Sequence, residues 1–535
     1  MNEAGGAHNA LAHLVRRHIG GRPGVAGRWR REDVFGPGLL CWAMDRILIT
    51  GARVLLPDAA SAPYQDILVE DGRIAALLPP GAVIENAARH DAAGRLVIPG
   101  LVNGHTHGHG GLSKGMGDKW DLALLLTHAP WIGGARGLEE KRLATMLTAV
   151  EMLRKGCTAG YDLAFEFPGP TVEGLEAMAD AYRAVGLRAV LAPMVADLTF
   201  FQATPGLIQA LPEEHQARAA GMSMMRGEEV LEAIHHAARG WRGGDVRLGC
   251  APTIPLHCSD DFLEGCRDLA AEHGLPMQTH VAEARYQAGA GEVRYGSTLL
   301  AHMDRLGLVN ERFSVAHGVW LTEADLALLA ERGGGLAHNP GSNMRLASGI
   351  APTRAAIRAG VTVGLGTDGS GSSDNQNMFE AMRLAAFASR LWEGATEEDW
   401  LGTAETVRLA TEGSAKLLGF EAGAIAPGKL ADLVFLDLSH INWAPFNDAA
   451  NQLVWTEDGS AVREVMVGGA WKLRDGRVLG VDEAKLARDA QEAADRLAGL
   501  NAGMRSWCEA IAPHVSCHCR TLGSRFTAAR RLLAH

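Results

Sequence analysis

Two histidines one residue apart, His105 and His107, have a spacing that suits metal ligands on a strand. They end the segment VIPGLVNGHTH, which starts at Val97 with a short apolar run before Pro99-Gly100. Successive side chains of a strand point to opposite faces, so residues i and i+2 share a face. Both imidazoles can therefore point the same way and form half of a zinc-type site, which usually has three or four N, O or S ligands. The same spacing also arises by chance, so this pair alone does not establish a metal site.

Four later segments repeat the pattern of a short apolar run that ends in a residue able to bind metal or transfer a proton. They read THVAE (279–283), VAHG (315–318), LAHNPGSN (336–343) and VGLGTDG (363–369). The residues concerned are His280, Glu283, His317, His338 and Asp368. Each one taken singly has an ordinary interpretation, such as a buried histidine or an Asp-Gly turn. Their joint occurrence predicts one site assembled from several strand ends.

Short apolar runs alternate with amphipathic helical stretches through the middle of the chain, which indicates βα units around a parallel sheet. Eight strands within about 325 residues favour an α/β fold, a (β/α)8 TIM-type barrel, whose chemistry gathers at the carboxyl ends of its strands. A doubly wound open sheet is the alternative. The candidate strands are 97–104, 158–163, 187–194, 246–252, 276–282, 313–317, 334–338 and 362–367.

The flanks of this middle region have the pattern of β-strands and turns. Asp71-Gly72 lies between apolar runs, a hairpin signal, and Asp475-Gly476 repeats it far downstream. We therefore expect a small composite β-sandwich domain from 44–97 plus 425–480, with the barrel of 98–424 inserted in it. Residues 1–43 are expected to be an extension outside the core. Residues 481–535 are expected to be a helical, basic tail at the surface or at an oligomer contact.

The composition is that of an ordinary soluble globular protein. It has 535 residues, 47% hydrophobic and 21% charged, with a net charge of −11, which argues against a general nucleic-acid binder. No apolar run approaches the roughly 18 residues of a membrane span. The eight cysteines form no disulfide framework, and no secretory signal is visible, so we expect a cytoplasmic protein.

The motifs PGLVNGHTH (99–107), THVAE, VAHGVWL (315–321), LAHNPGSN and VGLGTDG resemble those of the amidohydrolase superfamily. The similar branch contains cytosine, guanine and adenosylhomocysteine-type deaminases and triazine hydrolases, and the resemblance spans about 45–480. It implies one divalent ion, Zn²⁺ or alternatively Fe²⁺, held by His105, His107, His280 and Asp368. Binuclear relatives carry a bridging lysine or glutamate at the end of strand four, which this chain lacks. Cys250 is the residue there that could bridge two ions instead.

The resemblance also implies catalytic roles for three residues. Glu283 would move a proton to a ring nitrogen, His317 would polarise the attacked centre, and Asp368 would accept a proton from the attacking water. The ordinary alternatives are a solvated first-turn glutamate and a packed core histidine. Lys114, Trp120 and Asn343 are candidates for substrate contacts.

These motifs predict a metal-dependent deaminase of an amino-substituted N-heterocycle of the purine, pterin, pyrimidine or triazine type. One alternative keeps the site but hydrolyses a chloro or alkylamino triazine or a cyclic amide, so that the leaving group differs. A second alternative is a non-catalytic binding scaffold. By analogy with the branch, we expect a homo-oligomer whose partner is a small heterocyclic substrate, without nucleic acid or membrane.

Overall fold

Strands from both flanks of the chain combine in one sheet. The computed structural model describes residues 46–524 except 374 and 393, so the expectations for 1–43 and 525–535 lie outside the described residues. The nine-stranded sheet has the order β18-β17-β16-β15-β5-β1-β2-β3, with β4 paired to β1. Its strands are β1 (Arg46–Val54), β2 (Tyr64–Glu70), β3 (Arg73–Leu78), β4 (Ala88–Asp91), β5 (Arg95–Pro99), β15 (Leu433–Asp437), β16 (Val462–Val467), β17 (Ala470–Arg474) and β18 (Arg477–Val478).

The junction between the flanks is the antiparallel pair β5 and β15, in register from Leu433 opposite Pro99 to Asp437 opposite Arg95. These strands are about 340 residues apart in sequence, so segments from both flanks lie side by side in this sheet. Both strands are buried nearly throughout, because they lie in the middle of the sheet.

The segment between the flanks forms parallel strands in chain order. One sheet has the path β10-β8-β7-β6 with β9 on β8, the other has β11-β12-β13-β14, and a single parallel bridge between Cys250 and Met277 joins them. Each of the eight predicted strand regions contains strand structure. The strands are β6 (Leu101–Thr106), β7 (Cys157–Phe165), β8 (Arg188–Val195), β9 (Val246–Leu248), β10 (Ala251–Pro252), β11 (Met277–Val281), β12 (Phe313–His317), β13 (Gly335–His338) and β14 (Thr362–Leu365).

The first and last of these strands, β6 and β14, approach each other closely. The backbone N–H of Asp368 donates to the carbonyl of His105 at 2.9 Å. Gly104 is required here, since a Cβ on it would lie 2.8 Å from the carbonyl oxygen of Leu365. Among the described residues no strand ladder pairs β6 with β14, so their contact is made beside and beyond the strand ends.

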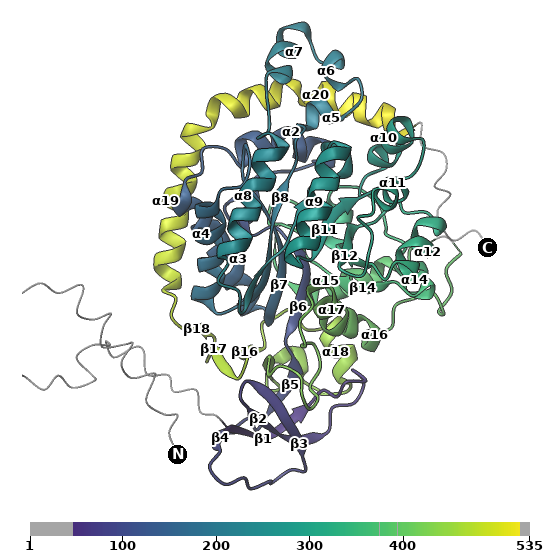
Figure 1. Ribbon diagram of the computed structural model, residues 1–535. Helices are drawn as coiled ribbons and strands as arrows, with labels where there is room; N and C mark the ends of the chain where they lie inside the picture. The colour runs from purple at the N-terminus through teal and green to yellow at the C-terminus, as the bar shows by residue number, and fades with distance from the viewer. Residues whose placement is uncertain (1–45, 374, 393, 525–535) are drawn as a thin grey trace, which may run out of the picture. The chain divides into compact units, whose positions relative to one another are not determined.

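Amphipathic helices cover the outside of the parallel strands (Figure 1). Helix α3 (Leu138–Arg154) ends before Gly156, whose φ of 78° suits glycine. The other helices that follow strands are α4 (Val172–Val185), α8 (Gly227–Gly240), α9 (Asp260–His273), α11 (Leu299–Arg305), α12 (Glu323–Glu331), α14 (Thr353–Ala359), α15 (Met378–Ala388), α16 (Thr403–Arg408), α17 (Ser414–Leu418) and α18 (Ala449–Trp455).

Helices in the loops after the strands carry a second apolar cluster. They are α2 (Leu122–Ile132), α5 (Phe200–Ala203), α6 (Leu207–Ala210), α7 (Glu213–Ala220), α10 (Arg285–Tyr295) and α13 (Pro340–Arg345). The C-terminal helices α19 (Glu483–Leu500) and α20 (Ala502–Ser524), yellow in Figure 1, follow, and α20 packs against α2, α6 and α10. Within the described part of the chain, no helix is both long and apolar enough to span a membrane.

Candidate active site

Three histidines present their Nε2 atoms to a common point because a carbonyl-type oxygen holds the Nδ1 of each. His105 Nδ1 donates to Gln278 Oε1 at 2.7 Å, His107 Nδ1 to the Leu163 carbonyl at 2.8 Å, and His280 Nδ1 to the Thr253 carbonyl at 2.6 Å. An oxygen acceptor requires the proton on Nδ1 and leaves a lone pair on Nε2. Burial lowers the pKa of His107 to about 4 and that of His280 well below its usual value, so both rings are neutral, the form that can bind a metal.

The spacing of these nitrogens fits a bound cation. His107 Nε2 and His280 Nε2 lie 3.3 Å apart although both Nδ1 protons are engaged elsewhere. Two lone pairs that face each other repel unless a cation lies between them. Tetrahedral zinc ligands at about 2.0–2.1 Å from the ion are roughly 3.3 Å apart. The buried His105 Nε2 has no hydrogen-bond partner, which is also expected of a metal ligand.

Asp368 adds a carboxylate to the same cluster. Its Oδ1 lies 3.2 Å from His107 Nε2 and 3.6 Å from His105 Nε2. Burial opposes its ionisation, but the surrounding imidazoles of His105, His107 and His317 hold the pKa of Asp368 well below its usual range. The carboxylate is therefore ionised, and three imidazoles with one carboxylate suit Zn²⁺ or Fe²⁺.

Two further groups flank the cluster. His317 Nδ1 donates to Asn343 Oδ1 at 2.9 Å, which turns its Nε2 to within 3.8 Å of Asp368 Oδ2. Glu283 Oε1 lies 3.8 Å from His317 Nδ1, and the Glu283 side chain is buried. Burial and the charge of Asp368 raise the pKa of Glu283 well above its usual value. The arrangement brings a carboxylic acid that retains its proton beside the metal-type cluster.

Strand register explains why these residues meet. In the β11–β12 pair, His280 lies opposite Ala316 and His317 opposite Val281, so both histidines lie at the same edge of the sheet. Asp368 and His317 have φ angles of 65° and 70°, left-handed conformations that few residues other than glycine adopt. Each bends the chain where a strand ends, which directs the side chain into the cluster.

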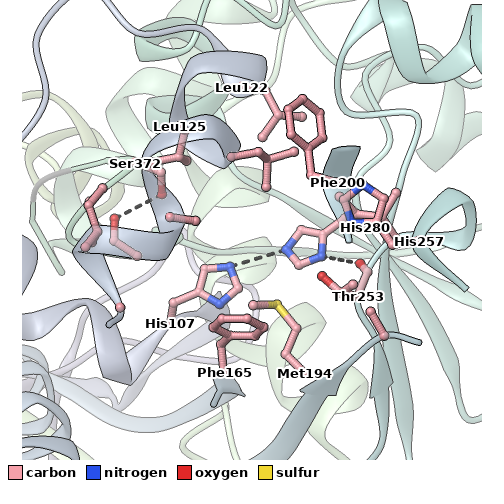
Figure 2. A pocket seen from close by; sticks show the side chains of 18 of the residues that line it. His107, Leu122, Leu125, Phe165, Met194, Phe200, Thr253, His257, His280 and Ser372 are labelled. Atoms are coloured by element: carbon pink, nitrogen blue, oxygen red, sulfur yellow. Dashed lines mark hydrogen bonds between the residues drawn. The ribbon is translucent and has the colours of Figure 1, made fainter. Parts of the chain in front are cut away.

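A cavity opens beside the cluster, and its walls are mainly apolar. Figure 2 shows Leu122, Leu125 and Phe200 on one side of His107 and His280, and Phe165 and Met194 on the other. The cavity measures about 230 Å³, and Glu283, His317 and Asp368 also line it. These walls come from loops after several different strands, as chemistry at strand ends requires.

The three predicted substrate residues have other contacts in this structure. Lys114 pairs with Glu151, and Trp120 stacks on His128 with ring centroids 4.4 Å apart. Asn343 orients His317 and is buried. None of the three is among the described residues that line the cavity. Cys250 does not line the cavity either, because it is buried in the apolar core together with Cys258 and Cys266.

Sequence reasoning missed the orienting groups and most of the apolar wall. Gln278 lies two residues before His280 and carried a signal in its spacing, because side chains at i and i+2 share a strand face. The carbonyl of Leu163, which accepts from His107 Nδ1, has no recognisable signal in the sequence. Phe165 ends β7, Met194 lies near the end of β8 and Phe200 begins α5, and these segments carry no recognisable motif, so only the folded structure brings the three side chains to the site.

Comparisons with known proteins agree with this geometry. The sequence profile of the Amidohydrolase family matches residues 96–472. The chain is 33% identical over 462 residues to a 5'-deoxyadenosine deaminase of Methanosarcina mazei, covering 85% of this chain and 99% of that one. It is 34% identical over 443 residues to an 8-oxoguanine deaminase of Pseudomonas aeruginosa, covering 81% and 94%.

Two solved structures are similar to this chain along almost their whole length. An adenosine deaminase from Xanthomonas campestris with bound zinc has a TM-score of 0.74 at 30% identity, covering 84% of this chain and 98% of that chain. A triazine hydrolase variant has a TM-score of 0.76 at 25% identity, covering 84% and 99%. The profile match extends over more than half of the chain, and the relatives are matched along almost their whole length. This chain therefore belongs to the amidohydrolase family.

Proposed function

We propose that this protein is a metal-dependent hydrolytic deaminase of an amino-substituted N-heterocycle. The observation that carries the proposal is the buried, proton-retaining Glu283, placed beside three converging histidines and Asp368. The deaminases among the relatives support the same reaction class. A buried carboxylic acid with a raised pKa can donate its proton to a ring nitrogen when the neighbouring carbon is attacked.

The ligand set favours a single ion, most simply Zn²⁺. His105, His107, His280 and Asp368 would hold it, and His317 Nε2 would stay free to contact the reacting group. When bound, a divalent ion of this kind acidifies a coordinated water so that it reacts as hydroxide near pH 7. Cys250 lies in the apolar core and does not line the cavity, which supports a mononuclear site, because strand four then offers no bridging ligand.

The side chains then divide the proton transfers between them. The water oxygen bonds to the ring carbon that carries the amino group, while Asp368 takes one of the water protons. Glu283 gives its proton to the adjacent ring nitrogen, and the unprotonated Nε2 of His317 accepts a hydrogen bond from the attacking water. Asp368 passes its proton to the amino nitrogen, the carbon–nitrogen bond breaks, and ammonia leaves. The second water proton restores Glu283, so the products are a ring carbonyl and ammonia.

Ammonia release by zinc-reconstituted protein tests this proposal directly. The panel contains aminopurines, aminopterins, aminopyrimidines, adenosyl compounds and aminotriazines. Ammonia from one ring class, absent with the Glu283→Gln protein, is the expected result. Metal-loaded protein that releases no ammonia from any ring contradicts the proposal.

A second candidate uses the same site with a different leaving group. The apolar cavity and the structural similarity to a triazine hydrolase favour it. Release of chloride or an alkylamine from a triazine, or ring opening of a cyclic amide, without ammonia would identify this reaction.

We also propose a closed (β/α)8 barrel over 98–424, because β6 and β14 approach within hydrogen-bond distance just beyond their ends. The flanks 44–97 and 425–480 would form the composite sandwich, and 481–535 would be an appended tail. A cytoplasmic homo-oligomer is consistent with this family assignment. Analytical ultracentrifugation measures its oligomeric state.

A further inference from the structure

The cavity beside the metal-type cluster has more apolar wall than a bare heterocycle needs. Beyond the catalytic groups, leucine, methionine and phenylalanine side chains from five segments form much of its lining: α2, the end of β7, the end of β8, α5 with its flanking residues, and 222–224. In Figure 2, Leu122, Leu125 and Phe200 form a continuous group above His107 and His280. Such a surface gains free energy only when an apolar group covers it.

Charged groups are scarce along this wall. Among the described residues that line the cavity there is no lysine or arginine, and the carboxylates are Glu283 and Asp368. Both carboxylates already have roles in the proposed reaction. Burial and the charge of Arg294 lower the pKa of the lining residue His257 to about 4, so it is neutral as well. A charged substrate tail would therefore find no partner on the described wall.

The polar side chains of the wall are largely occupied by the protein itself. Ser372 Oγ donates to the Gly369 carbonyl at 3.1 Å, and Thr199 Oγ1 bonds Gln202 Oε1 at 3.0 Å. Ser113 Oγ accepts a hydrogen bond from the buried Arg136 at 3.1 Å. These contacts leave few free donors for the polar tail of a substrate.

The apolar segments are held firmly in place. Thr199 and Gln202 form a capping box at the start of α5, and Asp121 caps α2 through the N–H of Leu124 at 2.9 Å. Behind the wall, Phe201 packs on Trp507 of α20 with ring centroids 5.6 Å apart. A wall supported in this way keeps its shape when empty and can select substrates by shape and polarity.

We propose that Leu122, Leu125, Phe200, Phe201, Met222 and Met224 form a subsite for an uncharged apolar substituent of the substrate, such as an alkyl, alkylthio or aryl group. The inference rests on the proposed function, because it assumes that the reacting ring lies at the metal cluster. It predicts that the enzyme selects substituents by their charge. Each buried methylene should raise kcat/KM about fourfold.

Matched substrate pairs test the subsite. Each ring of the ammonia panel is made with a butyl substituent and, separately, with a carboxypropyl substituent of similar length. We expect the butyl compound to have a kcat/KM at least about 100-fold higher, because an unpaired carboxylate is costly to desolvate. Calorimetry measures the binding of both compounds to zinc-loaded Glu283→Gln protein. This tests the subsite in the absence of turnover.

Two charge variants give the complementary result. Leu125→Lys and Met224→Lys each place an ammonium at a half-buried position of the wall. Each variant should bind the butyl compound more weakly and the carboxypropyl compound more tightly. Leu391→Lys is the matched control, because this position is 67% exposed and lies outside the cavity. It should change the binding of neither compound. Two positions are used so that, if one variant fails to fold, the other still tests the subsite.

The possible failures can be told apart. Equal binding of the two compounds to the Glu283→Gln protein, or wall variants that behave like Leu391→Lys, overturns the subsite even if ammonia is released. Absence of ammonia from every ring, together with tight binding of the butyl compounds alone, overturns the deaminase reaction and leaves the subsite supported.

Discussion

At the scale of single residues, the proposed metal site depends on the side chains that fix its imidazoles. Gln278 Oε1 accepts the Nδ1 proton of His105, and the amide of Gln278 is itself held by the Gly104 carbonyl at 3.1 Å and Ser314 Oγ at 3.0 Å. We expect Gln278→Leu to lower zinc affinity about 10- to 100-fold, as loss of a group that orients a ligand usually does. Competition with a chromogenic chelator measures this. Gln216→Leu on α7 is the control, and equal affinity in the two variants contradicts the role.

Glu283 is the residue whose loss should separate chemistry from metal binding. Glu283→Gln keeps the shape of the side chain but cannot donate a carboxylic proton, so kcat should fall by about 10²- to 10⁴-fold. The zinc content should be unchanged, because Glu283 is outside the proposed ligand set. Stopped assays of ammonia release with parallel metal analysis provide both values. Glu292→Gln, on the neighbouring helix α10, serves as the control, and normal turnover by Glu283→Gln would refute the mechanism.

At the scale of elements, the sequence predicted the parts that local pattern determines. His280 and His317 were expected at strand ends, and β11 and β12 place them at one sheet edge, because a buried parallel strand has a short apolar run that sequence displays directly. The apolar wall was not foreseen. Phe201 on α5 meets Trp507 on α20 about 300 residues later, and no periodicity in either segment encodes that contact.

Helix α20 therefore has a predictable effect on the cavity that it does not line. Trp507 is buried behind Phe201, so Trp507→Ala should loosen the apolar wall while leaving the metal cluster intact. We expect KM for an apolar-tailed substrate to rise about tenfold, roughly the effect of 1.4 kcal/mol, with little change in kcat. Steady-state kinetics separate the two constants. Trp507→Phe keeps an aromatic ring and should restore KM, whereas a fall in kcat alone would argue against a positioning role.

At the scale of the whole molecule, a buried ion pair joins the parallel strands to the nine-stranded sheet. Arg188 on β8 donates from Nε to Asp432 Oδ2 at 3.0 Å, and Asp432 Oδ1 also accepts from the N–H of Gly468 at 2.7 Å. Asp432 immediately precedes β15, so this contact lies where the chain returns from the catalytic segment to the sheet. Both side chains are largely buried, with exposed fractions of 8% and 1%.

Removing one partner of this pair should destabilise the whole fold. Asp432→Ala leaves the Arg188 guanidinium buried with only the exposed Asp245 beside it, and the free energy of unfolding should fall by about 3 kcal/mol. Asp489→Ala breaks the exposed ion pair with Lys485 and should change the free energy of unfolding by less than about 0.5 kcal/mol. Urea unfolding of zinc-loaded protein, followed by tryptophan fluorescence and by activity, measures both. If the two parts unfold as one unit, the two signals shift together in Asp432→Ala. Loss of activity well before the fluorescence transition would instead show that the catalytic segment unfolds independently of the sheet.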